Sequence, residues 1–252
     1  MSNLEVLQKS PLADIAALEL QPSETVLDWG KTLIVAPHPD DESLGGGGAI
    51  ALLREFQKAV VVLVLSDGTL SHPNSVKFPA EKLRDLRERE MLAALEILGV
   101  AADAVTFFRF QDRSVPDADS PDFKNAVERC RDYLKQTAPQ TILVPWRRDP
   151  HPDHRAAYSL LKTANKDSAK IIEYPIWLWE IAESADAPRF GEVTAKRIDI
   201  SRVTEKKQRA IRAHASQTTD LIDDDPHGFR LTDDILANFA DAYEVYLEGK
   251  NE

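Results

Sequence analysis

Two short clusters of histidine and acidic residues carry the chemistry that this sequence suggests. The first is Pro37-His38-Pro39-Asp40-Asp41-Glu42 and the second is His151-Pro152-Asp153-His154. Proteins bind zinc through imidazole nitrogen and carboxylate oxygen atoms, and a catalytic zinc keeps one position open for water. Together the two clusters supply enough ligands for one zinc ion and leave carboxylates over for proton transfer.

Each cluster directly follows a short apolar run, residues 32–36 before the first and 141–146 before the second. Apolar runs of this length that are rich in β-branched residues are typical of buried strands. Both clusters are therefore expected at the carboxyl ends of strands in one sheet, which is where ligands bind in open α/β sheets.

Strand and helix patterns alternate along the 252 residues. This alternation predicts an α/β fold, a Rossmann-like three-layer sandwich with a mostly parallel sheet and helices on both faces. Strands are expected at 32–36, 59–65, 105–109, 140–145, 170–175 and 195–200, with a further extended segment at 177–179. Helices are expected at 11–20, 44–57, 80–98, 121–137, 154–165, 202–214 and 231–248.

The stretch 36–45, taken together with 151–154, resembles the LmbE / PIG-L family of zinc-dependent N-acetylglucosaminyl deacetylases. Residues 87–90 and 213–217 also resemble pieces of the pattern of that family, so the similarity extends over residues 31–217. We therefore expect a single deacetylase domain over residues 1–252. Residues 1–30 would be a lead-in, and residues 218–252 would form a C-terminal loop and helix.

The resemblance also implies roles for the residues of the two clusters. It implies three zinc ligands, His38, Asp41 and His154. Asp40 would be the general base for the attacking water and His151 the partner acid, with Asp153 beside it to orient and charge it. Elementary chemistry agrees with these roles, because a carboxylate beside zinc can take a proton from water and a histidine paired with an aspartate can protonate a leaving amine at neutral pH.

Three further residues are candidates for substrate binding. Arg87 lies in a highly charged helix and matches the arginine that contacts the substrate in relatives. Asp112 follows the third strand, where it could hold sugar hydroxyls or be an ordinary loop aspartate. Trp146 could stack on a sugar ring or close the core.

The glycine run 45–48 suggests an alternative function that belongs to a different class of protein. Gly46, Gly48 and Ala51 satisfy the G-x-G-x-x-A spacing of a dinucleotide-binding oxidoreductase. However, the connection from the preceding strand is too long for a phosphate turn, and its acidic residues would repel a pyrophosphate. Glycines that let a helix approach neighbouring elements closely are the more consistent interpretation.

Other residues carry weaker signals. His72 and His227 lie in polar loops and are expected to be exposed, whereas His214 fits a surface or a pocket position equally well. Cys130, the only cysteine, is expected to be a buried and unreactive thiol.

Composition narrows the partners and the location. The net charge of −11 argues against nucleic acid, because phosphates would be repelled. We expect a cytoplasmic protein, since neither a secretory signal nor an apolar stretch long enough to span a bilayer is visible.

These observations predict a zinc-dependent hydrolase that removes the acetyl group from an N-acetylglucosamine-type amino sugar or a conjugate of one. Iron(II) could replace zinc, because the ligands suit either ion. The alternatives are hydrolysis of another small amide by the same metal site, and a non-catalytic relative that binds a sugar or a metal. The group attached to the sugar and the oligomeric state are left open.

Overall fold

An eight-stranded sheet forms the centre of the fold. The computed structural model describes residues 6–166 and 169–250. The strand order is β1-β7-β8-β6-β5-β2-β3-β4, and only β8 runs antiparallel to its neighbours. The strands are β1 (Leu20–Gln21), β2 (Thr32–Ala36), β3 (Val60–Ser66), β4 (Val105–Phe110), β5 (Thr141–Pro145), β6 (Lys170–Tyr174), β7 (Val193–Asp199) and β8 (Tyr243–Gly249).

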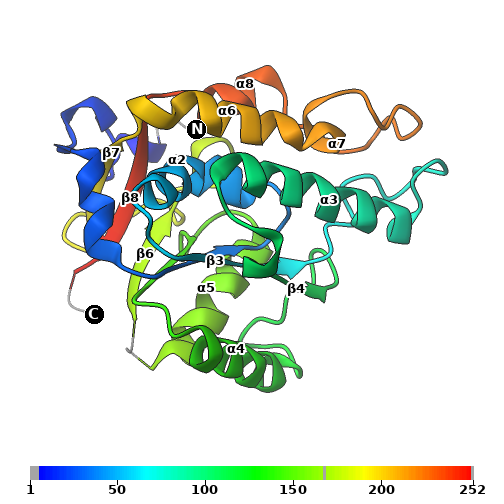
Figure 1. Cartoon of the computed structure of the whole chain (residues 1–252), viewed down its shortest axis with the longest axis horizontal. Coiled ribbons are helices and arrows are strands. Elements are labelled where there is room, and N and C mark those ends of the chain that lie inside the picture. Colours follow the sequence, from blue (N-terminus) through cyan, green and yellow to red (C-terminus); the bar gives the residue numbers. More distant parts are fainter. Residues whose placement is uncertain (1–5, 167–168, 251–252) are drawn as a thin grey trace.

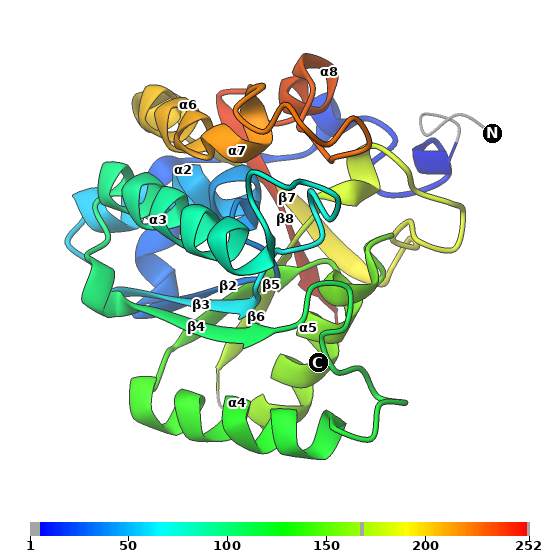
Figure 2. The ribbon, with the colours of Figure 1, turned by 90° about the vertical axis from the view of Figure 1, so that its right-hand side faces the viewer.

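Helices cover both faces of the sheet, as Figures 1 and 2 show. One face carries α2 (Asp41–Glu55), α3 (Ala80–Leu98), α6 (Thr204–Ala213), α7 (Ala215–Thr218) and α8 (Asp233–Ala237). The opposite face carries α4 (Phe123–Thr137) and α5 (Pro152–Asn165). The predicted three-layer α/β sandwich with a mostly parallel sheet is therefore confirmed.

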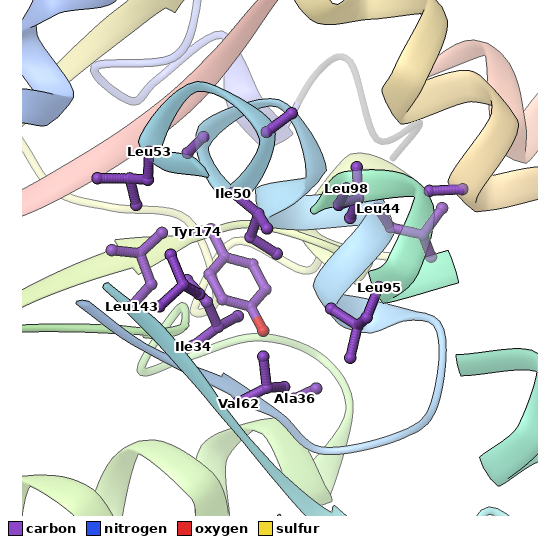
Figure 3. Packing of buried hydrophobic residues seen from close by; sticks show 14 of the residues in the cluster. Ile34, Ala36, Leu44, Ile50, Leu53, Val62, Leu95, Leu98, Leu143 and Tyr174 are labelled. Carbon is purple, nitrogen blue, oxygen red and sulfur yellow. The ribbon is translucent and has the colours of Figure 1, made fainter. Parts of the chain in front are cut away.

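The central strands β2 and β5 are buried at every position and mostly apolar, because both of their faces are covered. In β2, Ile34 and Ala36 face the layer of α2 and α3, whereas Leu33 and Val35 face α4 and α5. Figure 3 shows the first of these cores, in which the side chains of the strands meet those of α2 and α3. This alternation follows from the two-residue period of a strand.

The glycine run lies inside α2, which begins at Asp41, so it does not form the strand-to-helix turn of a dinucleotide site. A Cβ atom on Gly45 would lie 2.1 Å from the ring of Tyr174, and one on Gly48 would lie 2.6 Å from the side chain of Ile200. Such distances are incompatible with a side chain. The structure therefore supports the close-approach interpretation of these glycines.

The end of the chain differs from the prediction. Instead of one helix over 231–248, the structure has the short α8 and the strand β8. The segment Tyr243–Gly249 pairs with β7 along its length and fills the gap between β7 and β6. Tertiary pairing thus overrides the helical pattern, since Tyr243, Val245 and Tyr246 are residue types that also suit a strand.

Two other expected elements are wrong. Residues 177–179 form a 3₁₀-helix, η4 (Trp177–Trp179), because the backbone N–H groups of Ile176 and Trp177 turn toward the carboxylate of Asp149. The expected helix at 11–20 is replaced by turns, η1 (Ile15–Ala17) and the start of β1. The remaining 3₁₀-helices are η2 (Ser23–Trp29), η3 (Ala102–Ala104) and η5 (Ser201–Val203).

Among residues 6–166 and 169–250, no helix has both the length and the apolar character needed to cross a membrane.

Candidate metal centre and active site

The two motifs meet at the point where the strand order reverses. β2 pairs with β5 on one side and with β3 on the other, and the chain continues outward from each of these neighbours. The loop after β2 leads into α2, and the loop after β5 leads into α5, of which His151 is the N-cap residue. Crevices at such switch points are the usual ligand sites of open α/β sheets.

The three residues predicted to bind zinc come together around one carboxylate oxygen. Oδ2 of Asp41 lies 3.2 Å from Nδ1 of His38 and 3.2 Å from Nε2 of His154. Tetrahedral zinc with bonds of about 2.1 Å would hold its ligand atoms roughly 3.4 Å apart, so these separations suit a shared ion. His154 is fully buried. Within the described part of the chain, neither of its ring nitrogens has a hydrogen-bond partner of good geometry. The ligand set thus fits a metal ion.

The outward-facing nitrogens of these histidines lie beside carboxylates. Nε2 of His38 lies 3.1 Å from Asp153 and 3.3 Å from Asp112, and Nδ1 of His154 lies 3.2 Å from Asp149. Metal-binding histidines usually have such a partner, which fixes the ring and raises its basicity. Nδ1 of His38 and Nε2 of His154 are thereby left as the atoms that would bind a metal ion.

Three donor atoms lie within 4.8 Å of one another in two combinations of the described residues, and neither combination includes Asp41. One joins His38, His151 and His154, and the other joins His38, Asp112 and Asp153. Both include His38, which therefore lies at the centre of the whole cluster. We favour the Asp41 set, because the orphaned Nε2 of the buried His154 faces Asp41.

Asp40, the predicted general base, is buried next to the predicted metal ligands in an unusual backbone conformation. Its φ angle is +140°, a region that non-glycine residues occupy only when their surroundings enforce it. Its N–H donates to Oε2 of Glu42 at 3.0 Å, and its Oδ2 accepts from Nη2 of Arg87 at 3.0 Å. Burial raises the pKa of Asp40 to about 6, with Arg87 opposing the rise and Asp41 adding to it. A pKa near neutrality suits proton transfer in both directions.

His151 lies across the same cavity, with its ring centre 4.7 Å from that of His38. Burial, and then the positive charges of His154 and His38, lower the pKa of His151 to about 3. The imidazole is therefore neutral at pH 7 in this structure. The predicted role of an acid requires that it first gain a proton.

The predicted contact between the carboxylate of Asp153 and His151 is replaced by another arrangement. The Asp153 carboxylate pairs with His38 and accepts the backbone N–H groups of Arg113 and Val115. Only the backbone N–H of Asp153 reaches Nδ1 of His151, at 3.2 Å. The physical reason is that Asp153 begins α5 with its side chain under the loop of residues 111–115. From there its negative charge still favours the protonated form of His151.

The substrate-side predictions have mixed outcomes. Arg87 lines the cavity, yet its guanidinium is engaged by Asp40 and the carbonyl oxygens of Pro39 and Gly68. Asp112 also lines it, and its carboxylate accepts from the N–H of Leu70 at 2.8 Å besides contacting His38. Trp146 is fully buried and donates Nε1–H to the carbonyl oxygen of Asp186, away from the cavity. The core interpretation of Trp146 is therefore the correct one.

The structure also shows whether each of the remaining histidines is buried or exposed. His214 is buried, and its Nε2 lies 2.9 Å from Oε1 of Glu42. Because Glu42 also accepts the N–H of Asp40, His214 is connected to Asp40 through Glu42. His227 is exposed as predicted, whereas His72 is buried, because Gly228 packs directly against its ring.

Sequence reasoning missed Asp149 as a supporting residue. It is fully buried, and besides approaching His154 it accepts the N–H groups of His151, Ile176 and Trp177. Its position two residues before the second cluster was the available signal. One aspartate thus joins the second motif to η4 on the neighbouring strand connection.

The site opens into a cavity of about 230 Å³. Its polar lining includes most of the residues described above, namely His38, Asp40, Asp41, Arg87, Asp112 and His151. Cavities with a few convergent polar groups and perturbed pKa values are typical of active sites.

The sequence of this chain matches a known protein family. Residues 33–165, more than half of its length, match the family model PIG-L, described as GlcNAc-PI de-N-acetylase. The chain belongs to the PIG-L family. This agrees with the resemblance carried by the two motifs.

Relatives within this family differ in what they act on. The chain is 29% identical to a diacetylchitobiose deacetylase of Thermococcus kodakarensis, over 81% of this chain and 76% of the relative. It is 30% identical to a 4-oxalmesaconate hydratase of Pseudomonas putida, over 73% of each. A solved structure of N,N'-diacetylchitobiose deacetylase from Pyrococcus horikoshii has the same fold, with a TM-score of 0.62 and 22% identity over 86% of this chain and 79% of that one.

Proposed function

We propose that this protein is a zinc-dependent N-deacetylase that hydrolyses the acetamide of an N-acetylglucosamine-type amino sugar or conjugate. The observation that carries the proposal is the position of Asp40. Its carboxyl has a pKa of about 6 and faces the cavity directly beside Asp41, a proposed metal ligand. Deacetylases of N-acetylated sugars among its relatives support the same reaction.

The residues of the chain divide the reaction between them. Zinc held by His38, Asp41 and His154 would supply Lewis-acid chemistry for attack on an amide. Asp40 takes a proton from the attacking water, and Arg87 and Glu42 hold it in position. His151, neutral at rest, donates a hydrogen bond to the developing oxyanion. The proton taken by Asp40 is then available for the leaving amine, because its pKa allows release near neutral pH.

Addition of water to an unsaturated acid is the second candidate, because the hydratase of Pseudomonas putida is 30% identical to this chain. The lining of the cavity speaks against it. Asp40, Asp41 and Asp112 all face the site, and Arg87 is engaged by Asp40. Besides the zinc ion, Arg113 is then the arginine of the described lining that could pair with a substrate carrying several carboxylates.

The organisation of the chain is part of the same proposal. We infer that residues 1–252 act as one deacetylase domain. In support, Val6 and Leu12 pack in one cluster with Leu178 and Leu247 from distant parts of the sequence. The cytoplasmic location stays a prediction.

The test is amine release by metal-free protein reloaded with Zn²⁺ or Fe²⁺, using N-acetylglucosamine and several of its glycosides. We expect metal-dependent release, with Asp40→Ala retaining the metal but losing roughly 10²- to 10⁴-fold in kcat. His154→Ala should lose the metal itself. Near-normal activity of Asp40→Ala would show that the base is wrongly assigned. Water addition to an unsaturated dicarboxylate without amine release would favour the hydratase.

A further inference from the structure

The cavity has apolar lining residues besides its polar ones, and we call them the apolar wall. The apolar wall is formed by Leu44, Leu70, Trp177, Ile181, Phe229 and Leu231. These residues come from α2, from the loop after β3, from η4 and its surroundings, and from the segment before α8. None of them has a role in the proposed chemistry.

The apolar wall extends from the depth of the site to the surface. Leu44 and Leu231 are 2% and 3% exposed, whereas Leu70, Trp177 and Phe229 are half-buried and Ile181 is 62% exposed. An acetyl group presents a single methyl to the protein, and that methyl lies beside the reacting carbonyl. The wall is therefore much longer than acetyl binding requires.

The wall is also held in place. The rings of Trp177 and Phe229 pack edge to face with centres 5.6 Å apart, and the N–H of Phe229 donates to the carbonyl oxygen of Ser71 at 2.7 Å. The N–H of Leu231 donates to the carbonyl oxygen of Gln217 at 2.8 Å. A fixed apolar surface binds an apolar group without the cost of ordering itself first.

The six side chains of the apolar wall carry no charge that could pair with an anionic aglycone. Asp40, Asp41 and Asp112 also face the cavity, and Arg87 is paired with the first of them. Arg113, exposed at the lining, is a further cation there. A second sugar would leave its hydroxyl groups unpaired against the apolar wall, and each such group costs free energy.

We propose that the natural substrate is an N-acetylated amino sugar whose aglycone is apolar, an aromatic or alkyl group that lies on this wall. This inference rests on the proposed deacetylase function. The anomeric carbon of such a sugar is adjacent to the carbon that carries the acetamide. An aglycone therefore starts beside the reacting amide and can extend along the wall toward Ile181, while the acetyl methyl stays beside the metal ligands.

The test compares kcat/KM for matched substrates on the zinc-loaded protein. They are free N-acetylglucosamine, its phenyl and octyl glycosides in both anomers, diacetylchitobiose, and N-butanoylglucosamine. We expect kcat/KM for a phenyl or octyl glycoside to exceed that for free N-acetylglucosamine by about tenfold or more. Equal values, or a preference for diacetylchitobiose, would overturn the proposal. A preference for N-butanoylglucosamine would also overturn it, because the wall would then receive the acyl group.

A pair of variants at Ile181 tests whether the preference for apolar glycosides arises from the apolar wall. Ile181→Asp should reduce the ratio of apolar glycoside to free sugar toward one, and Ile181→Leu should keep it. Val76→Asp is the control, because Val76 is 87% exposed and lies outside the cavity. An unchanged ratio in Ile181→Asp would overturn the assignment. Absence of amine release from every substrate, with zinc bound, would instead contradict the deacetylase function itself.

Discussion

Nη2 of Arg87 lies 3.0 Å from Oδ2 of Asp40 and 2.7 Å from the carbonyl oxygen of Pro39. Nη1 of the same guanidinium donates to the carbonyl oxygen of Gly68, also at 2.7 Å. One buried side chain of α3 therefore holds the loop in which Asp40 adopts its strained conformation. Arg87, predicted from the sequence to contact the substrate, positions Asp40, the proposed general base.

Removal of the charge of Arg87 should alter the pH profile. The positive guanidinium lowers the pKa of Asp40 against the stronger effect of burial. Arg87→Met should therefore raise that pKa above about 6. Since the base acts only when ionised, the acidic limb of kcat/KM should move to higher pH. Arg87→Lys should move it less, and Arg89→Met, at an exposed position of the same helix, should not move it. An unshifted limb in Arg87→Met would contradict this coupling.

The carboxylate behind His154 should tune metal affinity. Asp149→Asn removes the negative charge that lies 3.2 Å from Nδ1 of His154. We expect the Kd for zinc to rise about 10- to 100-fold, the usual effect of losing such a partner. Competition with a chelator measures it, with the exposed Asp122→Asn as the control. A Kd equal to that of the wild type would mean that Asp149 supports the backbone alone.

A buried ion pair between α6 and β8 should be important for stability. Nζ of Lys207 lies 2.8 Å from Oε1 of Glu244, and the two residues are 2% and 4% exposed. Glu244 also accepts the N–H groups of Gly48 and Ala49 in α2. Lys207→Met leaves this carboxylate without its counter-charge and should lower the free energy of unfolding by about 3 kcal/mol. Urea denaturation provides the measurement, and Lys207→Met with Glu244→Gln should recover part of the loss. A loss below about 1 kcal/mol would show that the hydrogen bonds of Glu244 suffice.

The single thiol should be unreactive in the folded protein. Cys130 is fully buried in α4, and burial raises its pKa to about 12, with Arg129 opposing the rise. Since the thiolate is the reactive form, a disulfide reagent at pH 8 should label no thiol in the native state and one thiol in urea. Rapid labelling without denaturant would contradict this expectation.

The sequence predicted correctly those elements whose pattern depends only on burial. Apolar runs such as 32–36 and 141–145 are uniform because both faces of a central strand are covered, so they identified the sheet and the place of both motifs. The segment 243–249 was assigned to a helix, because its pairing partners β6 and β7 lie far away in the sequence.

The site could be predicted as far as residue types and spacing determine it. Both motifs meet, but spacing does not tell in which direction a side chain points. Trp146 is next to the site in sequence and faces the core, and the carboxylate of Asp153 reaches His38 instead of His151. Contacts between distant elements, such as that of Glu42 with His214, depend on the packing of helices and had no signal in either motif.

The position of β8 has a consequence for synthesis on the ribosome. β8 follows every other strand in the sequence, yet it lies between β6 and β7 in the sheet. Until it emerges, β7 and β1 have no bonded connection to the rest of the sheet, and α2 lacks the carboxylate of Glu244. The nascent chain therefore carries an open sheet edge at β6, and the helix that begins at Asp41 receives the carboxylate of Glu244 only after residues 243–249 have been made.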